Sequence, residues 1–376
     1  MWFLEHGESG LHLGGGLRYE VLVGDGAVWV FDGCRRMTQA DGSAVTVEGT
    51  DGATVVVVTA PEGVVLGPHR LGRVAKLPSA ILAELSEAGA CVLRGVADEG
   101  RVSRMRRAVA ARREAEGGAR TDGYHWDQGW LATDGDFVAA ATHPVVLWVV
   151  EKYLGEPLAH IRCLHTPIAN TLLPALDLVG AKFGGQMWHC DYPYHEDFTN
   201  QWPERPVSLQ CNLCVDDFRA DNGATLYVPA SHRENRWPTE LNAGVKTGSD
   251  DAVHAGKRHF LAPAGSAVLY DSRTWHRRPD ELNVSGATRV NVLLAFSHKW
   301  MRPMIPLRDE VAEFRANADL LAALPGRVRD AAALLFSGPE DAGDDGDDGD
   351  VSIEEVDLGA SSSDDEGGSR LFTRAY

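Results

Sequence analysis

The sequence is poor in cysteine, with six among 376 residues, and their spacing suggests no disulfide framework. Cys211 and Cys214 form a C-x-x-C pair, which is a pattern of redox and zinc sites. The pair lies in an apolar, strand-like run in which residues three apart face opposite sides, and no second cysteine pair follows. We therefore interpret both cysteines as packing residues.

Long hydrophobic runs are also missing, because no apolar stretch approaches the roughly 18 residues that a membrane helix needs. The N-terminus, MWFLEHGESG, has no basic segment followed by an apolar one, so no signal peptide is predicted. These absences predict a cytoplasmic protein that does not contact a membrane.

Positive charge is scarce: the chain has 36 lysines and arginines against 54 acidic residues, and a net charge of −18. Residues 340–376 hold thirteen acidic and two basic residues, so this tail accounts for −11 and the remaining body for −7. An acidic body argues against nucleic-acid binding, which requires a basic face. The tail cannot bury a core and is predicted to be disordered, with a protein partner as its candidate function.

The rest of the composition is globular, with 44% hydrophobic and 24% charged residues. The pattern along the chain predicts four regions. They are a β-rich N-terminal appendage (1–76), a main domain (77–306), C-terminal helices (307–338) and an acidic disordered tail (339–376). Within the main domain, helical patterns come first and at least six strand-like runs follow between 158 and 300. This order predicts a mostly β barrel or sandwich with flanking helices.

The main domain contains a His-x-Asp pair, His189 and Asp191, in the segment QMWHCD. If this segment is a strand, both side chains point to the same face and Cys190 points to the other. One histidine and one carboxylate on a face are two of the three ligands of a facial triad for non-haem Fe(II). His276 is the candidate for the third ligand, and Arg289 follows it in an apolar, strand-like run.

The surrounding segments strengthen this interpretation. NGATLYVPASH (222–232) and GSAVLYDSRTWH (265–276) precede or contain the candidate distal histidine, and N-x-S-x-x-x-R ends at Arg289. The set, together with LPSAILAELSEAGACVLRGV (77–96), resembles the phytanoyl-CoA dioxygenase (PhyH-like) family of Fe(II)/2-oxoglutarate oxygenases. Ala230 stands where the family has glycine. The resemblance covers about 77–303 and implies a double-stranded β-helix, that is, a jelly-roll or cupin-like core.

The resemblance also implies roles for individual residues. His189, Asp191 and His276 would bind Fe(II) as the catalytic centre, and Arg289 would pair with a carboxylate of the co-substrate 2-oxoglutarate. The further candidates for cofactor binding are Asn291, Gln186 and Asn170. Dioxygen would be the other co-substrate.

Aromatic and polar residues near these motifs are the candidates for contact with a small organic substrate: Tyr192, Tyr194, His195 and Trp275. Relatives that halogenate have a small residue in place of the carboxylate, so Asp191 favours hydroxylation of an unactivated C–H bond, with release of succinate and CO2. Desaturation and ring closure stay open as outcomes. The alternatives are a non-catalytic β-barrel binding or scaffold protein, and an oxygenase acting on a protein side chain.

Overall fold

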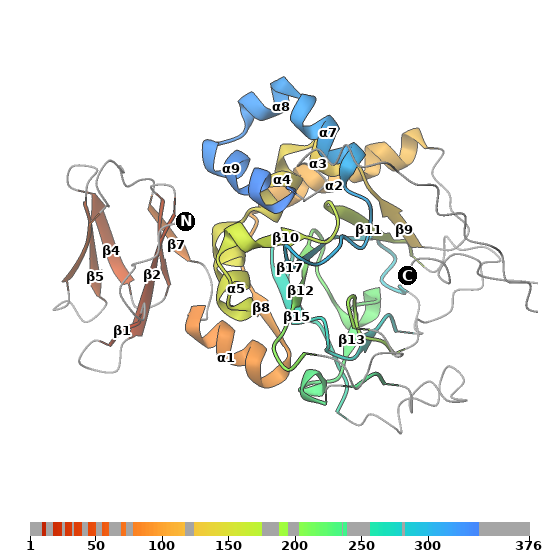
Figure 1. Cartoon of the computed structure of the whole chain (residues 1–376), viewed down its shortest axis with the longest axis horizontal. Coiled ribbons are helices and arrows are strands. Elements are labelled where there is room, and N and C mark those ends of the chain that lie inside the picture. The colour runs from red at the N-terminus through yellow and green to blue at the C-terminus, as the bar shows by residue number, and fades with distance from the viewer. Residues whose placement is uncertain are drawn as a thin grey trace, which may run out of the picture. The chain divides into compact units, whose positions relative to one another are not determined.

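The structure is a computed structural model of the whole chain (Figure 1). It describes the backbone of the strands between residues 10 and 72, and it describes residues 78–116, 124–174, 188–194, 203–234, 236–238, 256–279 and 283–337. Gln186, His195 and the acidic tail (339–376) therefore lie outside the described residues.

The N-terminal strands form two small sheets. One has the order β1-β2-β3-β7, with β1 at Gly10–His12, β2 at Arg18–Gly24, β3 at Ala27–Phe31 and β7 at His69–Gly72. The other has the order β4-β5-β6, with β4 at Cys34–Gln39, β5 at Ala44–Gly49 and β6 at Val55–Thr59. The β2–β3 hairpin closes between Gly24 and Ala27, where the GDG turn predicts a reversal of the chain.

The main sheet has seven strands, and all of its pairings are antiparallel. Its order is β8-β15-β12-β17-β11-β9, and β10 also pairs with β17. The strands are β8 (Ala90–Leu93), β9 (Tyr124–Asp127), β10 (Ile161–Cys163), β11 (Ile168–Leu172), β12 (Ser208–Cys214), β15 (Ala267–Asp271) and β17 (Arg289–His298).

A second sheet of three short strands has the order β14-β13-β16, with β13 at Leu226–Tyr227, β14 at Arg258–His259 and β16 at His276–Arg277. From β12 onward the chain thus passes between the two antiparallel sheets, because β12, β15 and β17 lie in the large one and β13, β14 and β16 in the small one. This arrangement confirms the predicted class of a mostly β core with flanking helices.

The helices are α1 (Pro78–Ala88), α2 (Glu99–Ala115), α3 (Trp130–Thr133), α4 (Gly135–Ala141), α5 (Pro144–Leu154), α7 (Arg308–Ala316), α8 (Ala318–Ala323) and α9 (Gly326–Leu335). Local chemistry sets several of their ends. Asp98 caps α2 by accepting a hydrogen bond from the Arg101 amide at 2.8 Å. Pro144 begins α5 and Gly155, with φ +72°, ends it.

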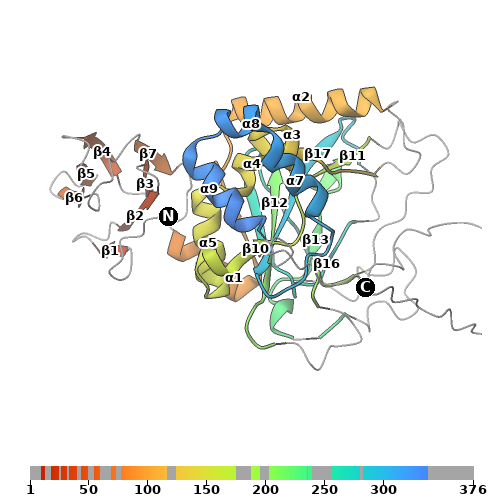
Figure 2. The same cartoon turned by 45° about the horizontal axis from the view of Figure 1, so that its top comes forward.

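Alternation along β17 divides the main sheet into two faces. Val290, Val292, Leu294 and Phe296 belong to the largest hydrophobic cluster, together with residues of α1, α2, α4, α5, α7 and α9. Figures 1 and 2 show these helices over the same side of the sheet. Because successive strand residues point to opposite faces, Arg289 and Asn291 face away from the helices.

The run Gly135–Leu154 is long and apolar enough to cross a membrane by length and composition, so the prediction that the chain has no such apolar stretch is wrong. The structure divides it into α4 and α5, separated by Thr142 and His143. Of its most apolar window, 83% is buried inside the domain. Such burial is typical of core helices, so this run gives only weak evidence for a membrane span.

Candidate metal centre

Two histidines and one carboxylate meet at the edge of the small sheet. His276 Nε2 lies 3.3 Å from Asp191 Oδ2, and His189 Nε2 lies 3.8 Å from Asp191 Oδ1. The ligand atoms of all three residues lie within 4.8 Å of one another. Atoms bound to one ion at about 2.1 Å can be no more than about 4.2 Å apart, so the separations of 3.3 Å and 3.8 Å both fit a common metal ion.

The backbone around His189 differs from the predicted regular strand. His189 and His276 exchange two amide–carbonyl hydrogen bonds, both of 3.1 Å, as an isolated antiparallel bridge. Two residues further on, the Asp191 amide donates to the Ser272 carbonyl at 2.8 Å. Both ends of the 189–191 segment are therefore hydrogen-bonded to the 272–276 segment. These bonds bring His276 beside His189 and Asp191.

The three side chains differ in their exposure. Those of His189 and Asp191 are 19% and 26% exposed, whereas that of His276 is 6% exposed. Burial raises the pKa of Asp191, but His276, His189 and the Tyr270 hydroxyl outweigh it and hold this pKa at about 2. The carboxylate is thus ionised at neutral pH, as a metal ligand must be.

Two further contacts orient the ligands. His276 Nδ1 lies 2.9 Å from the Thr274 carbonyl, which can only accept, so Nδ1 carries the proton and Nε2 faces Asp191. The Tyr270 hydroxyl donates to Asp191 Oδ2 at 3.0 Å. Sequence reasoning missed Tyr270. The sequence signal that could have indicated Tyr270 is its position in a strand-like run, six residues before His276.

The predicted cofactor-binding residues that the structure describes share one face of the main sheet. Asn291 of β17 pairs directly with Asn170 of β11, and Arg289 pairs with Leu172 in the same register. Arg289, Asn291 and Asn170 are 3%, 1% and 5% exposed. The Arg289 guanidinium lies 4.5 Å from the centre of the Phe218 ring. These polar groups thus line the interior of the β core on the face away from the helices.

Two of the predicted substrate residues are part of the hydrophobic core. Tyr194 and Trp275 are 1% and 4% exposed and belong to one cluster with Trp188 and Cys190. The Tyr194 hydroxyl accepts from the Val207 amide at 3.1 Å, and Trp275 Nε1 donates to the Arg236 carbonyl at 2.9 Å. This burial favours a packing role for both, because their polar atoms already have partners. Tyr192 is half-buried.

The conformation of segment 222–232, which carries part of the family resemblance, explains several of its residues. Gly223 has φ +73°, and a Cβ there would lie 2.4 Å from Leu172 Cδ2. Ala230 has φ +63°, a region that favours glycine, which agrees with the glycine that the family resemblance implies at this position. Ser231 Oγ accepts from the Trp275 amide at 2.8 Å, which links this turn to the residue before His276.

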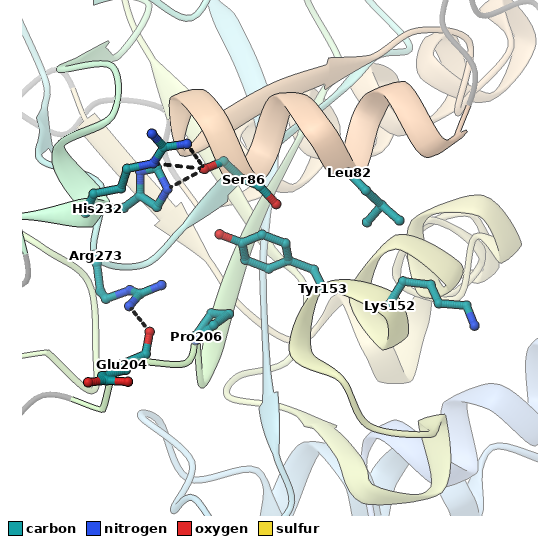
Figure 3. A pocket seen from close by; sticks show the side chains of 9 residues that line it. Leu82, Ser86, Lys152, Tyr153, Glu204, Pro206, His232 and Arg273 are labelled. Carbon is teal, nitrogen blue, oxygen red and sulfur yellow. Dashed lines mark hydrogen bonds between the residues drawn. The ribbon is translucent and has the colours of Figure 1, made fainter. Parts of the chain in front are cut away.

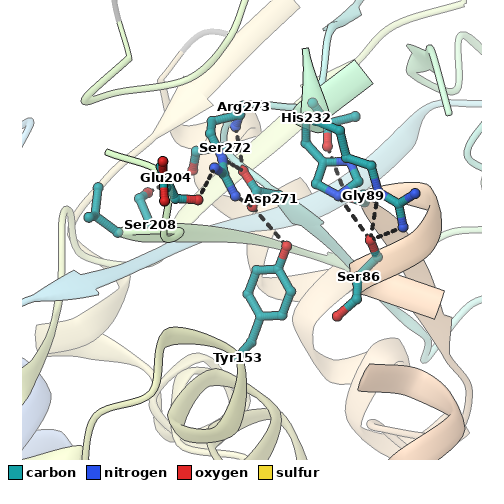
Figure 4. Close-up of polar contacts among 12 residues, drawn as sticks. Ser86, Gly89, Tyr153, Glu204, Ser208, His232, Asp271, Ser272 and Arg273 are labelled. Atoms are coloured by element: carbon teal, nitrogen blue, oxygen red, sulfur yellow. Dashed lines mark hydrogen bonds and ion pairs between the residues drawn. The ribbon is translucent and has the colours of Figure 1, made fainter. Parts of the chain in front are cut away.

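A buried ion pair braces the segment that leads to His276. Arg273 Nη2 lies 2.8 Å from Asp271 Oδ2 and its Nε donates to Oδ1 at 3.0 Å, while Asp271 is fully buried (Figure 4). The Tyr153 hydroxyl of α5 also donates to Asp271 Oδ2, at 2.8 Å. Burial raises the pKa of Tyr153, so its hydroxyl stays a donor at neutral pH. This network anchors the segment to the helical layer.

A cavity of about 520 Å³ lies beside this network, between α1, α5 and the segments 204–206, 232–233 and 273 (Figure 3). It is lined by Leu82, Ser86, Lys152, Tyr153, Glu204, Pro206, His232, Arg233 and Arg273. None of the three candidate metal ligands lines it. The cavity is therefore separate from the His189–Asp191–His276 cluster.

An antiparallel two-sheet core that brings two histidines and a carboxylate together is typical of the jelly-roll class of non-haem iron oxygenases. The family model described as Phytanoyl-CoA dioxygenase (PhyH) matches residues 85–289. The chain belongs to this family of iron- and 2-oxoglutarate-dependent oxygenases. The predicted family and jelly-roll fold class are thereby confirmed, as are the cofactors that define the family.

Curated relatives match a shorter part of the chain. An uncharacterized protein of Mycobacterium tuberculosis is 29% identical over 126 residues, which are 34% of this chain and 40% of that protein. An uncharacterized protein of Mycobacterium bovis gives the same values. The chain thus spans about two fifths of the length of the curated relatives that it matches.

Two solved structures are similar to part of the chain. HygX from Streptomyces hygroscopicus, with nickel and 2-oxoglutarate bound, has a TM-score of 0.48 at 15% identity and covers 60% of this chain and 88% of its own. The non-heme alpha ketoglutarate dependent epimerase SnoN from nogalamycin biosynthesis has a TM-score of 0.44 at 18% identity, covering 59% and 83%.

Proposed function

We propose that the protein is an Fe(II)- and 2-oxoglutarate-dependent dioxygenase that hydroxylates an unactivated C–H bond of a small organic metabolite and releases succinate and CO2. The observation that supports this most is the meeting of His189, Asp191 and His276, whose ligand atoms lie within 4.8 Å of one another in a chain of this family. Family membership supplies the reaction class, and the cluster supplies the residues for it.

His189, Asp191 and His276 are proposed to hold the iron. The fit is supported by the separations of 3.3 Å and 3.8 Å, by the ionised state of Asp191 and by the orientation of His276 through the Thr274 carbonyl. Iron bound here would supply the activation of dioxygen and of the keto acid. The protein's own contribution is to position both groups and to exclude water.

Arg289 is proposed to bind the distal carboxylate of 2-oxoglutarate. A guanidinium presents two parallel N–H donors to a carboxylate, and its place inside the β core, at 3% exposure, removes competing water. Asn291 lies two residues along the same face and is 1% exposed, and its side-chain amide nitrogen is a donor for the same carboxylate. Asn170, directly opposite Asn291, and Gln186, outside the described residues, stay predictions for the same ligand.

Asp191 supports hydroxylation over halogenation, because a retained carboxylate leaves no coordination site for a halide. The choice of substrate is less constrained. Tyr192 is the half-buried aromatic residue directly after Asp191 and stays the first candidate for a substrate contact, whereas His195 lies outside the described residues. The cytoplasmic location, the boundaries of the four regions and a protein partner for the acidic tail also stay predictions.

The test is to add Fe(II) and 2-oxoglutarate to the purified protein without oxygen and to record the weak visible charge-transfer band of the chelate. We expect the band in the wild type and its loss in His189→Ala. We expect Arg289→Ala to need a far higher concentration of 2-oxoglutarate to form it, and Arg289→Lys not to restore the affinity. His160→Ala is the matched control, since this histidine side chain is 67% exposed and is not one of the three candidate ligands.

Two results would overturn the proposal. One is a wild type without the band. The other is a band that His189→Ala and Arg289→Ala leave as strong as His160→Ala does. If the band forms as expected, adding oxygen and a panel of metabolites, with succinate and product analysis, separates hydroxylation from desaturation and ring closure.

A further inference from the structure

A second cluster of metal-binding residue types lies away from the candidate iron centre. It consists of Glu116, directly after the end of α2, and of His125 and Asp127 on β9. His125 Nε2 lies 3.5 Å from Glu116 Oε2 and also contacts Asp127 Oδ1. The ligand atoms of all three lie within 4.8 Å of one another, as in the candidate iron centre.

This cluster lies on the opposite face of the sheet from the iron centre. Asp127 pairs with Ala169 of β11, and His125 pairs with Thr171. Ala169 belongs to the helix-covered cluster, and residues paired directly across two strands point to the same face. His125 and Asp127 therefore face the helical layer, whereas Asn170 faces the core interior. An ion here would be independent of the first.

Two buried oxygens at this place have no hydrogen-bond partner among the described residues. One is Oδ2 of Asp127, a residue that is 5% exposed, and the other is Oγ1 of Thr171, which is fully buried. A buried oxygen without a partner is unfavourable for the folded state. Thr171 lies directly opposite His125, so both oxygens border the same cluster. A bound cation would satisfy both at once.

Among the described residues, Arg112 is the cation that acts on Asp127, and it does not fill this role. Arg112 of α2 has its guanidinium over the Trp130 ring, 3.6 Å from the centroid, and donates from Nη1 to the Gln128 carbonyl and from Nη2 to Thr133 Oγ1. Both terminal nitrogens of Arg112 thus donate to groups outside the cluster of Glu116, His125 and Asp127.

We propose that Glu116, His125 and Asp127 bind a structural divalent transition-metal ion, with the Thr171 hydroxyl or a water as a further ligand. One imidazole with two carboxylates suits Zn²⁺ or Mn²⁺. The ion joins the C-terminal end of α2 to β9, which is the last strand of the main sheet. It thereby fastens an edge strand whose neighbour, β11, holds Asn170.

The test is equilibrium dialysis of the full chain against Zn²⁺ alone and, separately, Mn²⁺ alone, followed by metal analysis. We expect two ions per chain in the wild type, one in Asp127→Asn and one in the double variant His189→Ala, His276→Ala. Combining the three substitutions should leave none. We also expect Zn²⁺ to raise the Tm of the His189, His276 double variant, because an ion that binds only the folded state stabilises it.

Glu116→Gln provides a variant that keeps the fold, because this side chain is 53% exposed. It removes one charged ligand, so we expect the affinity of the second ion to fall by about tenfold or more. Glu114→Gln, an exposed neighbour in α2, is the matched control and should bind as the wild type does. The proposal is overturned if the wild type binds one ion that the double variant loses, or if Glu116→Gln and Asp127→Asn bind as Glu114→Gln does.

Discussion

The hydrogen bond from Tyr270 to Asp191 gives the sharpest test of how the candidate iron centre is built. Tyr270 is 5% exposed, and its hydroxyl donates to Asp191 Oδ2 at 3.0 Å. Replacing Tyr270 by Phe removes this one bond and keeps the ring that packs against His276 at a centroid distance of 4.9 Å. The substitution therefore isolates the orientation of the carboxylate from the packing around it.

The expected magnitude follows from the charge of the acceptor. A hydrogen bond to a charged group contributes about 1.5–3 kcal/mol, which corresponds to a change in affinity of about 10- to 150-fold. Loss of a group that orients a metal ligand typically lowers metal affinity by about 10- to 100-fold. We thus expect Tyr270→Phe to weaken Fe(II) binding by about one to two orders of magnitude.

The assay is an anaerobic titration with Fe(II) at saturating 2-oxoglutarate, followed by the charge-transfer band, which reports the candidate iron centre alone. Tyr227→Phe is the matched control. Tyr227 stacks on Phe260 at 4.2 Å in the same aromatic cluster, and its backbone pairs with His276 across β13 and β16, which the substitution leaves in place. Equal affinities in Tyr270→Phe and Tyr227→Phe would refute the reasoning that Tyr270 orients a metal ligand.

Three further predictions concern stability, each measured by urea unfolding against the wild type. Ala230→Gly should raise the free energy of unfolding by about 0.5–1 kcal/mol, because φ is +63° there; a decrease would contradict this. Gly223→Ala should lower it by about 1–3 kcal/mol, since the new Cβ would meet Leu172 at 2.4 Å; an unchanged value would show that Leu172 moves aside freely. Tyr153→Phe should lower it by about 1–3 kcal/mol through the lost bond to buried Asp271, and a loss below 0.5 kcal/mol would count against that bond.

Sequence reasoning reached the family and the fold class because both depend on local patterns. Strand-like runs between turn residues predict an antiparallel core, and the N-G and P-A-S-H segments occupy turns that require their conformations, as Gly223 and Ala230 show. The alternation of polar and apolar residues in RVNVLLAFSH also places Arg289 and Asn291 on one face without any structure.

Other features were out of reach because they depend on long-range contacts. The orientation of Asp191 by Tyr270 joins residues 79 apart in sequence. The burial of Tyr194 and Trp275 follows from their packing with Trp188 in one cluster, whereas the sequence pattern offered both as candidates for substrate contact. The Glu116–His125–Asp127 cluster needs the end of α2 beside β9, which no periodicity indicates.

The sequence by itself determined the residue types of the candidate iron centre and the spacing of His189 and Asp191. It also determined the turns with positive φ at Gly223 and Ala230, since all of these features depend on neighbouring residues. Only the tertiary structure decided that these residues meet. The His189–His276 bridge and the Asp191–Ser272 hydrogen bond join segments about 80 residues apart, and the Arg273–Asp271–Tyr153 network holds the second of them. A metal site needs several ligand atoms within a few ångströms, and only the closed β core brings such distant residues that close.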